Sequence, residues 1–290
     1  MAIHVRPSAV VLTLSTLLLW GCGGSSADVG VGLQNSSTGQ LSGPTGAIGQ
    51  QLSPYEILDL QAGTTTTATA IPDLTSNSLY YTTDMVFRRV HGLQSDYFLG
   101  VFTITQGQWK LLNGGGTPWT AIDTSVVPAP SSGTDTDSLP ASNISFALIS
   151  SAVQVYNLTA HAQLSVPTLR QWQFACAAGT DPTAWSWGAS RDPAVWKPYA
   201  NLLDNQVPPT SPSPIPTFTP VGSLLPNAFG FYDMHGNIWE WVTPGPHICG
   251  GCFDDGIDQA RTDNVAGSDT CVVTEQTSHA LIGARLVLTP

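Results

Sequence analysis

The residues of this sequence best suited to chemistry gather in one short stretch, residues 227–241. Asp233 and Glu240 stand on either side of a tight turn, and Gly236 within it indicates backbone geometry that a side chain would block. Two carboxylates and several free carbonyls at one bend make a candidate site for a hard cation, because calcium takes oxygen ligands. The first chemistry to test is therefore metal binding at this turn.

Cysteine offers a second kind of chemistry. The chain has five cysteines, and Cys249 and Cys252 form a Cys-x-x-Cys pattern that fits a redox pair or half a zinc site. No second Cys/His pair with zinc spacing accompanies them in the sequence, which makes zinc the weaker alternative. In an oxidising compartment, Cys271 is a candidate disulfide partner for either Cys249 or Cys252. Cys176 lies in an apparent helix and is expected to be buried.

The N-terminal segment predicts export. Arg6 precedes an apolar run over residues 9–20, too short to span a bilayer as a helix but typical of a secretory signal. The run ends in Leu19-Trp20-Gly21-Cys22, which resembles a bacterial lipobox and implies a signal peptide over residues 1–21 with lipidation of Cys22. We therefore expect secretion across the inner membrane and a membrane-anchored lipoprotein of the bacterial cell envelope. The alternative is an ordinary signal peptide with a chance cysteine.

The segment after Cys22 is rich in Gly, Ser, Thr and Gln and poor in charge up to about Ala70. It has no sustained helical or strand period, so we interpret residues 22–75 as a flexible spacer, within which residues 54–61 are a candidate ordered piece. The remaining residues, 76–290, number about 215 and suffice for one sizeable domain.

The composition disfavours one class of function and favours one kind of fold. The net charge of −11 and the pI near 4.6 disfavour nucleic-acid binding, because phosphates would be repelled. Only 10% of residues are charged, 42% are hydrophobic and nine are tryptophan, which suits a loop-rich extracytoplasmic fold with an aromatic core. Trp239 and Trp241 would share one face of a strand, with Glu240 on the other.

Local patterns predict short elements within the domain. Residues 85–100 form two strands joined by a polar turn. Capping-box spacings that begin at Thr105 and at Thr168 each predict the start of a helix. A further helix with an apolar face is expected over residues 147–161.

Three segments resemble one known family. Residues 229–241 read Phe-Gly-Phe-Tyr-Asp-Met-His-Gly-Asn-Ile-Trp-Glu-Trp, similar to the Gly-Leu-Tyr-Asp-Met-x-Gly-Asn-Val-Trp-Glu-Trp of the formylglycine-generating enzyme, or sulfatase-modifying factor, family. Residues 164–179 resemble its Arg-Leu-Pro-Thr-Glu-Ala-Glu-Trp-Glu-Tyr-Ala-Ala, and residues 282–287 resemble its closing Gly-Phe-Arg-Leu. The resemblance spans about residues 80–288. It implies a C-type-lectin-like α+β fold, rich in loops with few short helices and strands.

The resemblance also implies calcium. The family binds it at two sites through side-chain and carbonyl oxygens. The corresponding residues are Asn201 and Leu202 at the first site and Asp233, Gly236, Ile238 and Glu240 at the second. The alternative is a calcium-free turn whose two carboxylates bond to the backbone.

The family's oxidase activates oxygen with copper(I), which soft thiolates bind well. Its two cysteines follow the serine of a Gly-Gly-Ser-Tyr turn by about two and seven residues. The corresponding turn here ends at Cys252, and the count falls on Asp254 and Gln259, which are not copper(I) ligands. Cys249 and Cys252 are the remaining weak candidates for catalysis.

Two functions from different classes remain. The first is a lipoprotein that binds or scaffolds an unknown protein or small ligand without catalysis, through a face formed by about Cys249–Ala280. Arg261 and Arg285 are its candidate ligand-binding residues. The second is a copper-dependent oxidase that converts a sulfatase cysteine to formylglycine. We favour binding, because function has to be argued from the site rather than from the fold.

Overall fold

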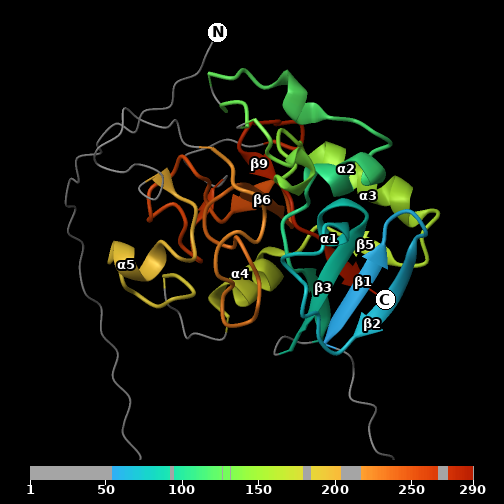
Figure 1. Ribbon diagram of the computed structural model, residues 1–290, viewed down its shortest axis with the longest axis horizontal. Helices are drawn as coiled ribbons and strands as arrows, with labels where there is room; N and C mark the ends of the chain where they lie inside the picture. Colours follow the sequence, from blue (N-terminus) through green and yellow to red (C-terminus); the bar gives the residue numbers. More distant parts are fainter. Residues whose placement is uncertain are drawn as a thin grey trace, which may run out of the picture. The chain divides into compact units, whose positions relative to one another are not determined.

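The computed structural model describes residues 54–91, 95–125, 127–130, 132–178, 184–203, 217–266 and 274–289. By internal contacts the chain divides into two units, Met1–Gln50 and Gln51–Pro290, and every described residue belongs to the second. The signal peptide, Cys22 and Cys271 lie outside the described residues. Within the second unit, two small sheets and several short helices are joined by long loops (Figure 1).

The larger sheet has six strands in the order β2-β1-β3-β4-β10-β5, and each neighbouring pair is antiparallel. Its strands are β1 (Tyr55–Asp59), β2 (Thr64–Ala68), β3 (Asp84–Val90), β4 (Tyr97–Gly100), β5 (Gln163–Ser165) and β10 (Val287–Thr289). The predicted strand pair over residues 85–100 is confirmed as β3 and β4. The last strand, β10, inserts between β4 and β5, which leaves β5 at one edge of the sheet.

This sheet begins earlier in the sequence than expected. β1 pairs with β2 on one side and β3 on the other, and its Leu58 is fully buried. The expected spacer over residues 22–75 is therefore wrong from Tyr55 onward, and the candidate ordered piece at residues 54–61 is confirmed. The spacer prediction failed because β2 reads Thr-Thr-Thr-Thr-Ala: β-branched side chains favour a strand even where no apolar residues alternate.

The smaller sheet has four strands in the order β8-β7-β6-β9. They are β6 (Trp239–Val242), β7 (His247–Cys249), β8 (Val265–Ala266) and β9 (Ile282–Gly283). β6 pairs in parallel with β9 and antiparallel with β7. The chemistry-bearing turn thus leads directly into a central strand.

The helices are short. They are α1 (Leu79–Thr82), α2 (Gln106–Leu112), α3 (Phe146–Asn157), α4 (Leu169–Ala177) and α5 (Pro193–Trp196), with 3-10 turns η1 (Pro118–Ala121) and η2 (Thr136–Ser138). Both predicted capping boxes are present, at Thr105 before α2 and at Thr168 before α4. In the described part of the chain, no helix has the length and apolarity needed to cross a membrane.

Tryptophan dominates the core, as the composition predicts. Trp109 and Trp241 belong to one buried cluster, and Trp172 belongs to a second that also contains Cys176. The expectation that Cys176 is a buried helical residue is confirmed. The loop-rich α+β architecture is confirmed as well.

Candidate functional site

The turn before β6 depends on backbone that glycine accommodates best. Gly236 has φ +81°, and a Cβ added there would lie 2.2 Å from the carbonyl oxygen of Asn201. Asn237, the next residue, is also left-handed at φ +64° and donates its backbone N–H to that same carbonyl over 2.8 Å. The turn therefore packs so closely against the Asn201 carbonyl that a side chain at position 236 would not fit.

The amides of Asn201 and Asn237 extend this tie. Asn201 Nδ2 donates to Asn237 Oδ1 over 3.1 Å, and Asn237 Nδ2 donates to the Thr219 carbonyl over 3.2 Å. Leu202 is fully buried in an apolar cluster. The two residues that correspond to the family's first calcium site thus hold loops together, with the Asn201 side chain acting as a donor.

Glu240 is the most heavily bonded acid in the described part of the chain. It is 1% exposed, and its carboxylate accepts from Trp172 Nε1 at 2.7 Å and from Thr103 Oγ1 at 2.5 Å. Arg285 donates Nη2 to Oε1 at 2.9 Å and Nε to Oε2 at 3.0 Å, a two-point ion pair. Both carboxylate oxygens are therefore already engaged by charge-assisted hydrogen bonds.

Arg285 is itself fully buried. Beyond Glu240, its guanidinium donates to the carbonyls of Gly100, Val101 and Tyr232 at 2.7–2.9 Å. The expectation that Arg285 binds a ligand is therefore wrong, because the side chain is inaccessible and its donors are used inside the fold. This buried ion pair could not be predicted from local sequence, because Glu240 lies 45 residues from Arg285 in the chain.

Asp233 differs from Glu240. It is 4% exposed; Oδ2 accepts the Gly222 N–H at 2.8 Å, while Oδ1 is buried and has no hydrogen-bond partner among the described residues. Burial, the largest influence, raises the pKa of Asp233 to about 6. The expected calcium set therefore does not fit as a whole: Asp233 has a spare oxygen, but the Glu240 carboxylate faces Arg285. Within the described residues no three His, Cys, Asp or Glu side chains converge as a metal site.

His235 links the turn to two other loops. Its Nδ1 donates to the Ala260 carbonyl at 2.7 Å, and its Nε2 accepts the Ser186 N–H at 3.1 Å, so these partners select the neutral ring with the proton on Nδ1. Burial lowers the pKa of His235 to about 4. The Cys176 sulfur lies 3.6 Å from Nε2, and burial raises the pKa of that thiol to about 12. This buried pair lacks the thiolate that nucleophilic chemistry requires.

The two cysteines of the Cys-x-x-Cys pattern are free, buried thiols in different surroundings. Cys249 ends β7 inside the apolar cluster that holds Trp172, whereas the Cys252 N–H donates to Asp255 Oδ2 at 2.8 Å. Burial raises the pKa of both thiols, and at Cys252 the charges of the acidic neighbours Asp255 and Asp254 raise it further. The disulfide expected between Cys271 and one of these cysteines stays a prediction, because Cys271 lies outside the described residues.

Comparison with known proteins decides the family. The family described as the sulfatase-modifying factor enzyme 1-like domain matches residues 56–270, most of the chain. This chain belongs to that family.

Its curated relatives match over a shorter part. The formylglycine-generating enzyme of Mus musculus is 30% identical over 80 residues, which is 27% of this chain and 21% of the mouse protein. The formylglycine-generating enzyme of Mycobacterium tuberculosis is 34% identical over 80 residues, which is 27% of this chain and 26% of that enzyme. The chain thus spans about a fifth to a quarter of the relatives it matches.

Solved structures support the same fold. Treponema denticola variable protein 1 superposes with a TM-score of 0.55 at 15% identity, over 72% of this chain and 96% of that one. PvdO from Pseudomonas aeruginosa gives a TM-score of 0.50 at 17% identity, over 71% and 83%. These likenesses agree with the C-type-lectin-like fold of sulfatase-modifying factor domains.

A surface of this sulfatase-modifying factor domain that the sequence did not predict surrounds Trp185. Arg191 and Arg261 lie over its ring, with guanidinium carbons 5.4 and 5.7 Å from the centroid. Arg261 donates twice to Asp263 at 2.8 Å, and Arg191 forms a two-point ion pair with Asp258. The expected ligand-binding residue Arg261 therefore lies at the surface, and its neighbour Arg191 is a site residue that was not predicted from the sequence. The pattern Trp-Ser-Trp-Gly was its only local signal.

Proposed function

We propose that this sulfatase-modifying factor domain binds or scaffolds a partner without catalysis, as part of a lipoprotein of the cell envelope. The binding face is the C-terminal segment from about Cys249 to Ala280 together with the Trp185 surface. Calcium at the turn and copper at the thiols are not part of this proposal.

The burial of the two thiols is the observation that supports a function without catalysis. Copper(I) is held by thiolates, yet Cys249 and Cys252 are 0% and 1% exposed and burial favours their protonated forms. The positions expected for the oxidase pair are Asp254 and Gln259, both exposed and neither a sulfur ligand. An oxygen-activating pair would need both sulfurs to face one accessible cleft.

The Trp185 surface supports binding. The exposed Arg191 and the partly exposed Arg261 are fixed by carboxylates above the buried Trp185 ring, and arginine is enriched where proteins bind partners. Trp187 stacks on Trp185 with ring centroids 5.9 Å apart and planes 4° apart, which stiffens the base of this surface. A rigid face loses little conformational entropy on binding.

The assay for the alternative function is direct. The purified chain, incubated with copper(I), oxygen and a Cys-x-Pro-x-Arg peptide, is expected to yield no formylglycine by mass spectrometry, while the Mycobacterium tuberculosis enzyme serves as the positive control. Product that disappears in Cys249→Ser or Cys252→Ser would establish the copper-dependent oxidase instead.

The membrane anchor has its own test. In a bacterial host, the full chain is expected to sediment with membranes and to carry lipid on Cys22 by intact mass, whereas Cys22→Ser is released or left unprocessed, because one lipidated cysteine is the proposed attachment. Ser26→Ala is the matched control and should behave as the wild type. A wild-type chain without lipid mass would rule out the anchor.

A further inference from the structure

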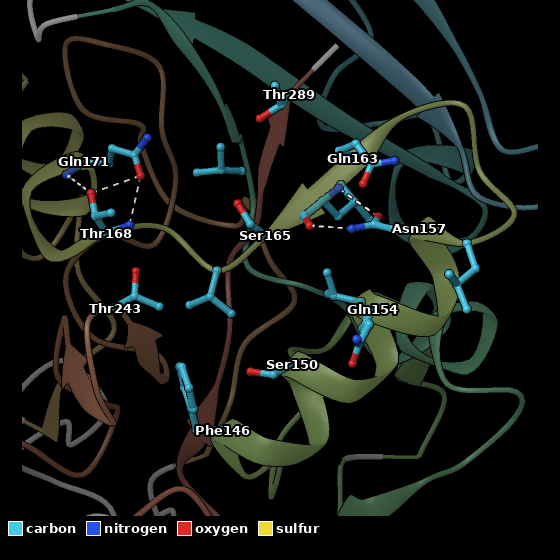
Figure 2. A pocket seen from close by; sticks show the side chains of 15 residues that line it. Phe146, Ser150, Gln154, Asn157, Gln163, Ser165, Thr168, Gln171, Thr243 and Thr289 are labelled. Carbon is cyan, nitrogen blue, oxygen red and sulfur yellow. Dashed lines mark hydrogen bonds between the residues drawn. The ribbon is translucent and has the colours of Figure 1, made fainter.

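A hollow of about 740 Å³ lies beside α3, away from the segment proposed as the binding face. Helix α3 forms one wall, the edge strand β5 and the loop after it form another, and the N-terminus of α4 with the end of β10 closes it (Figure 2). Neither the turn before β6 nor the Trp185 surface contributes to it. The hollow therefore has no role in anything described above.

Its lining carries no ionised group. No Lys, Arg, Asp or Glu lines it, and the sequence contains none of the four from Ser138 through Leu169, the stretch that builds most of the walls. What lines it instead is a set of amide and hydroxyl side chains around an apolar floor that includes Phe146 and Val166. A charged ligand would find no counter-ion here, so the chemistry suits a neutral one.

Five polar side chains around the hollow are uncommitted. They come from α3, β5 and β10, and none has a hydrogen bond to another described residue. They are Ser150, Gln154, Gln163, Ser165 and Thr289, and Figure 2 shows them around the opening. Each amide supplies donors and an acceptor, and each hydroxyl supplies both.

An extended peptide does not suit this edge of the sheet. A peptide would add to β5 through its main chain, but Leu164 is already capped: its N–H donates to Asn157 Oδ1 at 2.9 Å and its carbonyl accepts Asn157 Nδ2 at 2.8 Å. On its other side β5 pairs with β10. The side chain of Asn157 thus takes the place that an incoming strand would occupy.

We propose that this hollow binds a neutral oligosaccharide. Sugar hydroxyls donate and accept at once, which matches free amides and hydroxyls, and the C–H face of a sugar ring is apolar, which matches Phe146. Phe146 is held in place edge-on to Trp241, with ring centroids 5.8 Å apart. The proposal does not depend on the function of the C-terminal face.

The test uses defined probes. Calorimetry of the full chain with maltohexaose, cellohexaose and chitohexaose is expected to detect binding of at least one at about 1 mM or below. The double variant Gln154→Ala/Gln163→Ala is expected to bind that sugar about tenfold more weakly, because it loses amide hydrogen bonds. Both glutamines are exposed, so the variant should fold as the wild type does, as circular dichroism will show.

Gln61→Ala is the matched control, since this exposed glutamine lies in the β1–β2 turn outside the hollow, and it should leave the affinity unchanged. A hexagalacturonate and an extended threonine-rich peptide test the two other ligand classes. The proposal fails if none of the three neutral sugars binds, if the double variant binds as tightly as the wild type, or if only the acidic sugar or the peptide binds.

Discussion

Replacing Arg285 with methionine is expected to lower the free energy of unfolding by about 3–5 kcal/mol, the cost of leaving a buried charge without its partner. Methionine keeps much of the side-chain length but removes every donor. Glu240 would retain Trp172 and Thr103 while losing the cation that balances its charge. The carbonyls of Gly100, Val101 and Tyr232 would lose their donor as well. Urea unfolding followed by tryptophan fluorescence measures the change.

A double-mutant cycle separates the ion pair from general disruption. Glu240→Gln alone leaves a buried, unpaired guanidinium, whereas Arg285→Met/Glu240→Gln removes both charges, so the double variant should be less destabilised than the sum of the two. Arg191→Met is the matched control. Its ion pair with Asp258 is exposed to solvent, and its loss should be barely measurable. If Arg285→Met and Arg191→Met unfold at the same urea concentration, the buried pair does not stabilise this fold.

The Arg285–Glu240 pair also explains why the family resemblance led us to expect a calcium ligand at Glu240 that its surroundings do not favour. The signature around residue 240 matches the family well, and a glutamate at that position is an expected calcium ligand. Its neighbours decide what it does. Thr103, Trp172 and Arg285 reach it from three distant parts of the chain, and no local pattern reports contacts of that sequence separation. A transferred ligand role therefore needs the surroundings as well as the residue.

Local chemistry was the part of the fold that sequence predicted well. The capping boxes at Thr105 and Thr168 involve residues three apart, and both helices begin where these boxes place them. Helix α3 was predicted over residues 147–161 but ends at Asn157. That residue turns its amide to Leu164 of β5, a tertiary contact that overrides the apolar period beyond it.

The edge strand β2 and the surface features of the fold were not predicted from the sequence. β2 shows no alternation because it lies at the edge of its sheet and is mostly exposed, so burial leaves no pattern in its threonines. The Trp185 surface joins Arg191 to Asp258, 67 residues apart. The hollow beside α3 is visible in sequence only as a stretch without charge, which equally describes a buried segment.

Asp233 is expected to contribute to stability at low pH and to lose that contribution as pH rises, and replacing it with asparagine should remove this pH dependence. Burial holds the pKa of Asp233 at about 6, above its ordinary value of 3.8, with Glu240 adding to the rise and Arg285 opposing it. The folded chain therefore binds this proton more tightly than the unfolded chain. Its stabilisation is complete below about pH 4 and is lost as pH rises through about 6, a change of about 3 kcal/mol for a shift of roughly two units.

The measurement is the free energy of unfolding of Asp233→Asn minus that of the wild type, in EDTA, at several pH values between 4 and 8. We expect this difference to rise by about 2 kcal/mol across that range, most of the full linkage effect, because asparagine does not titrate. Gln61→Ala, at an exposed site with no titratable side chain before or after the change, is the control and should give a flat difference. A flat difference for Asp233→Asn would contradict an ionised, buried Asp233.

The wild-type curve alone cannot reveal this effect, because His235 titrates in the same window with the opposite sign. Burial lowers the pKa of His235 to about 4, so its contribution is present above its ordinary value of 6.5 and is lost as pH falls through about 4. Only the difference between variants isolates Asp233. Calcium then tests the remaining expectation at the turn. An ion held by the spare Asp233 oxygen would stabilise the wild type at pH 8 but not the variant, which would lower the difference measured at that pH. Because Glu240 is already paired with Arg285, we expect calcium to leave the curve unchanged.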